Sequence, residues 1–187
     1  HLLGDFAFAI WDPNERQLFC ARDHLGVRPF YYYFSEECLA FGSEIKSLLT
    51  IEEVPCRLNE VRIADYLALL YEDQEITEYE GILRLPPGHA LLANATGVRK
   101  RKYWELRKGD PINMEDDRAY AERFLELMKQ SVRCRMRSSK PVATELSGGL
   151  DSSFVTCLAR DVSRNSVHTV SALYPGTPAA DERDYIK

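Results

Sequence analysis

The segment of this chain best suited to chemistry runs from Glu145 to Ser153 and reads Glu-Leu-Ser-Gly-Gly-Leu-Asp-Ser-Ser. A short apolar stretch precedes it and a helix-like stretch follows it, so we expect a buried strand that turns sharply into a helix. Adjacent glycines permit positive φ and let the backbone approach a ligand closely. The first amides of a helix lack intrahelical partners and carry a partial positive charge. The segment therefore predicts a turn that binds phosphate.

The side chains of this turn extend the same chemistry. Ser147, Ser152 and Ser153 supply hydroxyl donors. The carboxylate of Asp151 stands where it could help to hold a magnesium ion beside a bound phosphate. The turn contains no lysine and does not fit GxxxxGK[ST], which excludes a Walker-type loop. The alternative interpretation is an ordinary glycine-serine turn that caps a helix.

The elements around the turn read as one strand-helix-strand unit of a parallel sheet. We expect a strand over 142–146, a helix over 152–162 and a second strand over 167–173. A longer helix over 116–137, capped by Asp116 or Asp117, precedes them. Its apolar face comprises Ala121, Phe124, Leu125, Met128, Val132 and Met136, and its last turns carry Arg133, Arg135 and Arg137, which suit a helix C-terminus.

The first hundred residues have the alternation of short strands. We predict a meander of antiparallel strands over 6–12, 17–22, 30–34 and 39–41, joined by hairpins. A short helix with Ser43 as N-cap follows, and an amphipathic helix begins after Asn59, with Val61, Ala64, Leu67 and Leu70 at helical spacing. A further hairpin joins 89–93 to 98–104, and the charged segment 107–111 is the predicted inter-domain linker.

Composition excludes several functional classes. The chain has 187 residues, 45% of them apolar and 28% charged, and a formal net charge of −5, as expected of a globular protein. This acidic balance argues against nucleic acid as the main partner. No apolar run approaches the roughly 20 residues of a membrane helix, and no secretory leader is present, so we expect no membrane contact and a cytoplasmic location. A homodimer is compatible with the sequence, which does not fix the oligomeric state.

Other chemically suggestive residues favour structural roles. The five cysteines are widely spaced without a CxxC pattern, and we interpret them as reduced, mostly buried thiols. Asp23-His24 could be an acid-base pair, but we interpret Arg22-Asp23 as supporting the fold. The basic run 98–102 is interpreted as a solvated strand face rather than an RNA-binding surface. Tyr31 to Tyr33 is interpreted as core plus interface.

Several motifs of the chain resemble a known enzyme family. SGGLDSS resembles the pyrophosphate loop of the ATP-pyrophosphatase superfamily. Three other segments, 3–12, 21–32 and 41–48, resemble the later half of a class II glutamine amidotransferase domain. The segments 84–89 and 102–104 are similar, in order and spacing, to the asparagine synthetases. Taken together, these motifs resemble the glutamine-hydrolysing asparagine synthetases over almost the whole chain.

The resemblance implies a fold and an activity. Residues 1–106 would be the C-terminal part of a glutaminase domain, α+β with an Ntn-hydrolase-like layered sheet, and 107–187 the N-terminal part of an α/β ATP-pyrophosphatase synthetase domain. The parent enzyme would be an ATP-dependent ligase of asparagine biosynthesis. It would convert aspartate to asparagine with glutamine-derived ammonia through β-aspartyl-AMP, releasing AMP and pyrophosphate.

The resemblance also implies site residues, with ATP and Mg²⁺ as cofactors. The residues that bind ATP and pyrophosphate would be Leu146, Ser147, Gly148, Gly149, Leu150, Asp151, Ser152, Ser153 and Ala172, with Asp151 near the metal. The family's nucleophilic cysteine and glutamine-binding residues correspond to positions before His1, so we expect no catalytic residue here and an inactive fragment. Cys20 and Cys38 are expected to be structural, and Asp181-Glu182 matches an acidic pair of the family.

Two alternatives remain open at this point. The β-lactam synthetases and lasso-peptide cyclases resemble asparagine synthetase through the same segments and differ in the acceptor. The chain itself could instead be an inert, nucleotide-binding fragment.

Overall fold

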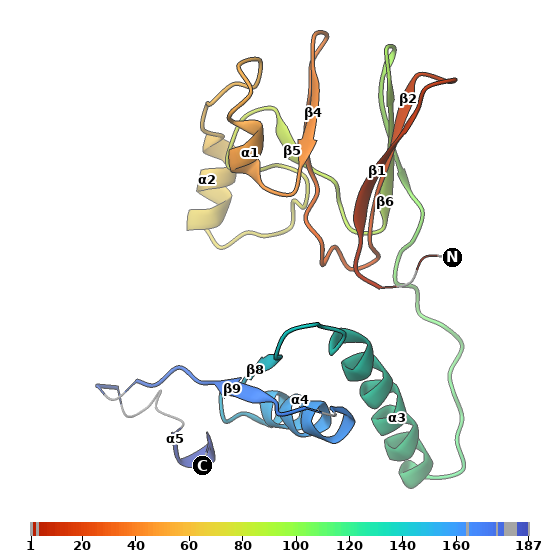
Figure 1. The fold of residues 1–187 in the computed structure, drawn as a ribbon, viewed down its shortest axis with the longest axis vertical. Coiled ribbons are helices and arrows are strands. Elements are labelled where there is room, and N and C mark those ends of the chain that lie inside the picture. Colours follow the sequence, from red (N-terminus) through yellow and green to blue (C-terminus); the bar gives the residue numbers. More distant parts are fainter. Residues whose placement is uncertain (1, 3, 164, 175, 178–182, 187) are drawn as a thin grey trace. The chain divides into compact units, whose positions relative to one another are not determined.

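The computed structural model describes residues 2, 4–163, 165–174, 176–177 and 183–186. The chain divides into two compact units, residues 1–109 and 110–187. No helix within the described ranges is long and apolar enough to cross a membrane. Figure 1 shows both units, coloured along the sequence.

One sheet of the first unit has four antiparallel strands, two from its beginning and two from its end. Its order is β1 (Ala7–Asp12), β2 (Gln17–Arg22), β6 (His89–Asn94) and β7 (Gly97–Lys102). The predicted hairpins β1-β2 and β6-β7 are confirmed, with the first turn held by the Asp12 carboxylate, which accepts from the Asn14 amide at 2.9 Å. The side chains of 99–102 are exposed, which agrees with a solvated strand face.

The second sheet has the order β4 (Leu39–Gly42), β3 (Tyr31–Phe34) and β5 (Ile82–Arg84), all antiparallel. The predicted meander is wrong at one step, because β2 pairs with β6 and β3 pairs with β5, so β2 and β3 are not partners. The predicted hairpin of β3 and β4 is confirmed. The partner strands β5 and β6 both follow α2 in the chain. The short strand β5 was not predicted. The unit is a mixed α/β domain with antiparallel sheets, as Figure 1 shows.

Arg22 and Asp23 hold the crossing between the two sheets, which confirms their structural interpretation. The Arg22 guanidinium donates to the carbonyls of Arg28 at 2.7 Å, Leu85 at 2.6 Å and Gly26 at 2.6 Å. The Asp23 carboxylate accepts from three amides between Leu25 and Arg28 at 2.9–3.1 Å. Burial raises the pKa of Asp23, but these amides outweigh it and the pKa lies below its usual value.

The helices of this unit depart from expectation. Helix α1 (Ile45–Leu48) is capped by Glu44, not by Ser43, because Glu44 is still in extended backbone. Helix α2 (Glu60–Leu67) begins after the predicted cap Asn59, whose side chain accepts from the Arg62 amide at 3.3 Å. The apolar residues that were expected to pack are exposed, among them Val61 at 64% and Leu67 at 77%.

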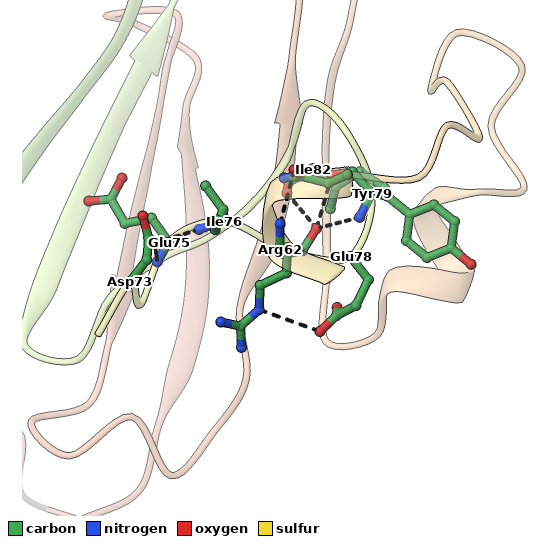
Figure 2. A network of polar contacts seen from close by, with 9 residues as sticks. Arg62, Asp73, Glu75, Ile76, Glu78, Tyr79 and Ile82 are labelled. Carbon is green, nitrogen blue, oxygen red and sulfur yellow. Dashed lines mark hydrogen bonds and ion pairs between the residues drawn. The ribbon is translucent and has the colours of Figure 1, made fainter. Parts of the chain in front are cut away.

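A polar network holds the segment between α2 and β5 (Figure 2). The fully buried Thr77 hydroxyl donates to the Ile82 carbonyl at 2.7 Å. Arg62, 8% exposed, lies with its Nε 3.8 Å from a Glu78 carboxylate oxygen. Asp73 accepts from the Glu75 and Ile76 amides, and these bonds lower its pKa. Arg62 is thus the buried residue of α2, whereas the apolar Val61 and Leu67 of the same helix are exposed.

The second unit contains α3 (Asp117–Arg135), β8 (Ala143–Glu145), α4 (Leu150–Val162), β9 (His168–Val170) and α5 (Arg183–Ile186). Strands β8 and β9 are parallel, so the predicted strand-helix-strand unit is confirmed, with α4 beginning two residues earlier than expected.

Helices α3 and α4 share a small core. Val132, Leu158 and Ala159 are buried there, with Met128 and Met136 packed around them. Asp116 caps α3, as predicted, by accepting from the Ala119 amide at 2.8 Å. The other predicted apolar positions of α3 are less covered, since Phe124 is 58% exposed although its ring stacks on that of Phe154.

The cysteines correct one expectation. All five are free, but only Cys20 is buried and Cys38 is half-buried, whereas Cys56, Cys134 and Cys157 are exposed. The prediction of mostly buried thiols is therefore wrong. Burial raises the pKa of Cys20 to about 12, which suits the structural role expected of it.

Candidate functional site

The glycine-serine turn lies at the carboxyl end of β8, where the chain enters α4. Gly148 has φ +94°, a conformation that side chains rarely adopt. Gly149 is the N-cap of α4 with φ −72° and ψ 160°, which is ordinary extended backbone. The expected positive φ therefore applies to only one of the two glycines, and Gly148 alone makes the sharp turn.

Unpaired amides lie at the start of α4. The Ser153 amide makes the first helical hydrogen bond, to the Gly149 carbonyl at 3.1 Å. The amides of Leu150, Asp151 and Ser152 precede it and have no hydrogen-bond partner among the described residues. Such a group of donors at a helix start is suited to an anion.

Two serines of the turn bond to each other. The Ser147 and Ser152 hydroxyls lie 2.9 Å apart, and the Ser152 hydroxyl also accepts from the Ser147 amide at 3.1 Å. The Ser152 hydroxyl donates to the Gly149 carbonyl at 3.1 Å, and the Gly149 amide donates to the Ser147 hydroxyl at 3.3 Å. The turn is thus closed by its own side chains.

Strand β9 holds the beginning of the turn. The Leu146 amide donates to the Val170 carbonyl at 2.9 Å, and the Ser171 hydroxyl donates to the Leu146 carbonyl at 2.6 Å. The hydroxyls of Thr144 and Thr156, 3.0 Å apart, join β8 to α4. Sequence reasoning missed Ser171, Thr144 and Thr156. The available signal was a hydroxyl residue directly after the second strand of a strand-helix-strand unit.

The remaining predicted site residues surround this turn. Leu146 and Ala172 follow neighbouring parallel strands, Leu146 half-buried and Ala172 exposed. Leu150 is 90% exposed, Asp151 is exposed and Ser153 is half-buried. Asp181 and Glu182 lie outside the described residues.

Asp151 is the candidate metal ligand of this turn. Among the residues that the structure describes, no three His, Cys, Asp or Glu side chains come together as a metal site. A single carboxylate beside phosphate oxygens and water nonetheless fits Mg²⁺, which is commonly held by one or two carboxylates and its substrate.

Comparison with known proteins identifies the family. The sequence model of a glutamine amidotransferase domain matches residues 1–104, which is more than half of the chain. The chain belongs to the glutamine amidotransferase family. The asparagine synthase model matches residues 123–187 of the same chain, so this family member carries both expected segments in the expected order.

Curated relatives agree with this assignment. A putative glutamine-hydrolysing asparagine synthetase 2 of Methanocaldococcus jannaschii is 36% identical over 189 residues, covering 98% of this chain and 36% of the relative. Asparagine synthetase 3 of Bacillus subtilis is 36% identical over 160 residues, covering 85% of this chain and 26% of the relative. The predicted resemblance to the glutamine-hydrolysing asparagine synthetases is confirmed.

A third relative is named an amidase. The amidase chry2 of Gibberella zeae is 33% identical over 158 residues, covering 83% of this chain and 23% of the relative. This chain spans about a third or less of the length of these relatives.

Proposed function

We propose that this chain belongs to an ATP-dependent amidotransferase that converts aspartate to asparagine with ammonia from glutamine. Residues 1–106 would form the later part of its glutaminase domain and 107–187 the first part of an ATP-pyrophosphatase synthetase domain. The observation that carries the proposal is the glycine-serine turn beside the parallel strands β8 and β9, in a chain whose first 104 residues match a glutamine amidotransferase domain.

In this proposal the turn holds the phosphates of ATP. The unpaired amides at the start of α4 donate to the β- and γ-phosphates, and Ser153 adds a hydroxyl. Leu146 and Ala172 border the adenine ring, since nucleotides bind beyond the carboxyl ends of parallel strands. Asp151 holds Mg²⁺, which would neutralise charge on the phosphates when bound.

The proposed reaction has two steps. A side-chain carboxylate oxygen of aspartate attacks the α-phosphorus, the bond to the bridging oxygen breaks, and pyrophosphate leaves with the bonding electrons. Ammonia then attacks the acyl carbon of β-aspartyl-AMP, loses a proton, and displaces AMP to give asparagine. Donors in the turn stabilise the charge that develops on the departing pyrophosphate, and because they are already oriented they need no rearrangement.

A second candidate changes only the acceptor. One fungal relative is named an amidase and not a synthetase. The second candidate is accordingly amide formation on another carboxylate, with the same turn and the same release of pyrophosphate. The β-lactam synthetases and lasso-peptide cyclases are further versions of this candidate.

The test is turnover by the full-length protein. We expect ATP, aspartate and either glutamine or ammonium to yield asparagine, AMP and pyrophosphate in equal amounts, measured by chromatography and a pyrophosphate assay. Asp151→Ala should lower the rate at least about tenfold. The matched control Asp161→Ala, at the other end of α4, removes an exposed carboxylate that pairs with Lys129 and should keep the rate.

Two outcomes contradict the proposal. Formation of AMP with other carboxylic acids but not with aspartate selects the second candidate. Unchanged turnover in Asp151→Ala removes the proposed metal role of that residue.

A further inference from the structure

The peptide unit between Leu146 and Ser147 is held at both of its polar ends. Its carbonyl oxygen accepts from the Ser171 hydroxyl at 2.6 Å, and its N–H donates to the Ser152 hydroxyl at 3.1 Å. Because a peptide is planar, fixing these two ends fixes the orientation of the whole unit. The two serines come from opposite sides of the turn, Ser171 from the end of β9 and Ser152 from the first turn of α4.

The Ser171 side chain bonds to the turn just beyond the last backbone hydrogen bond between β8 and β9. The Leu146 amide bonds to the Val170 carbonyl, which continues the parallel pairing one step beyond β8. The Leu146 carbonyl is instead taken by a side chain, Ser171 Oγ. A carbonyl at the edge of a phosphate site repels the ligand, so its attachment to β9 keeps this oxygen away from an incoming anion.

The hydroxyl protons of Ser147 and Ser152 are both used in hydrogen bonds within the turn. The Ser152 hydroxyl uses its single proton on the Gly149 carbonyl. In its 2.9 Å contact with Ser147, the Ser147 hydroxyl must therefore be the donor. Ser152 thus acts inside the turn, and the donors left for a ligand are the amides at the start of α4.

We propose that Ser171 is a positioning residue of the pyrophosphate turn and that it acts with Ser152 by clamping the Leu146–Ser147 peptide. The inference rests on the proposed function. Without the Ser171 hydroxyl the peptide is free to rotate, and its carbonyl oxygen can replace the Ser147 N–H on the inner side of the turn. An oxygen there opposes phosphate, so the loss falls on ATP and not on aspartate.

The experiment compares three variants of the full-length enzyme by steady-state pyrophosphate release. Ser171→Ala should raise KM for ATP by about threefold to tenfold, the effect of one lost hydrogen bond, and leave KM for aspartate unchanged. Ser171→Thr retains the hydroxyl and should restore the wild-type KM. Thr169→Val is the matched control, because it removes an exposed hydroxyl from β9 that forms no hydrogen bond with the described residues of the turn.

Each contrary result overturns the inference. An unchanged KM for ATP in Ser171→Ala, an equal rise in Thr169→Val, or no restoration by Ser171→Thr shows that the hydroxyl does not position the turn. Thermal unfolding of all three variants should stay near that of wild type. A rise in both KM values together with a lower melting temperature would indicate a structural role only.

Failure of the proposed function gives a different result. If the wild-type enzyme releases no pyrophosphate with aspartate, the reaction is wrong, and calorimetric binding of Mg-ATP to the same variants tests Ser171 directly. Weaker binding in Ser171→Ala alone then supports the clamp. Equal binding in all variants, or none in the wild type, overturns it.

Discussion

Single residues of this chain differ in role even where the sequence makes them look alike. Gly148 and Gly149 are neighbours, but only Gly148 needs a positive φ. Ser147, Ser152 and Ser153 share a motif, but Ser147 and Ser152 are occupied with each other. The backbone conformation and the hydrogen bonds, rather than residue type, separate the shaping residues from those free to bind.

The glycine pair offers a direct test of this difference. Gly148→Ala forces a side chain into a positive φ and should lower the free energy of unfolding by about 1–2 kcal/mol. In Gly149→Ala the new Cβ would meet, among the described residues, Ser147 Oγ at 3.5 Å, and its φ of −72° suits alanine, so the loss should stay below about 1 kcal/mol, the cost of alanine at an N-cap. Chemical denaturation followed by circular dichroism measures both, and equal losses would contradict the assignment.

Asp23 should make the stability of the first unit depend on pH. Its pKa is lowered in the folded state, so its stabilisation is present above its unfolded pKa of about 4 and is lost as the pH falls through the folded value. Asp23→Asn turns an NH₂ group toward backbone donors and should cost about 2 kcal/mol at neutral pH.

The pH series carries its own control. The difference between wild type and Asp23→Asn should shrink as urea unfolding is repeated from neutral pH to about pH 3. The exposed Asp110 lies outside the unit, and Asp110→Asn should show no such trend. A constant difference across the series would show that the charge of Asp23 does not stabilise the fold.

At the scale of elements, α4 connects the turn to the core of its unit. Its N-terminus presents the free amides, and Leu158 and Ala159 on its buried face pack against Val132 of α3. The position of the site therefore depends on packing between two helices. Helix α2 shows the opposite case, since its buried residue is the charged Arg62 and the apolar Leu67 is exposed.

Removing the packing of α4 should destabilise the second unit. Leu158 is 5% exposed, and Leu158→Ala should lower the free energy of unfolding of this unit by about 2–4 kcal/mol through loss of buried area and a cavity. Val155→Ala on the same helix starts from 38% exposure and should cost less than about 1 kcal/mol. Hydrogen exchange of the α4 amides measures the effect locally, and equal protection in both variants would contradict it.

At the scale of the whole chain, the boundary between the two compact units falls between residues 109 and 110. The chain around this boundary, from 103 to 116, has no helix or strand, and the side chains of Arg107 and Lys108 are exposed. The matches to two different family models fall on either side of the same segment.

Limited trypsin digestion should therefore cut first after Arg107 or Lys108, because exposed chain without regular structure is the preferred site of proteolysis. Mass spectrometry should find two fragments that resist further cleavage. Replacing both residues by Gln should remove this first cut. An earlier cut inside either unit would contradict the division.

Local features of this protein could be predicted from its sequence. Spacing was sufficient for the β1-β2 hairpin, for the Asn59 and Asp116 caps, and for the strand-helix-strand unit around the turn. These features depend on neighbours within a few residues, so composition and periodicity carry them. The motifs were also sufficient to recognise the family.

Features that join distant parts of the chain could not be predicted in this way. The pairing of β2 with β6 and of β3 with β5 joins residues far apart in the chain, and no local pattern encodes it. On α2 the charged Arg62 is buried and the apolar Val61 and Leu67 are exposed, which is the reverse of what the apolar spacing predicts. The bond from Ser171 to Leu146 spans 25 residues and exists because β8 and β9 lie side by side. A side chain that orients a distant peptide is visible only once the strands are paired.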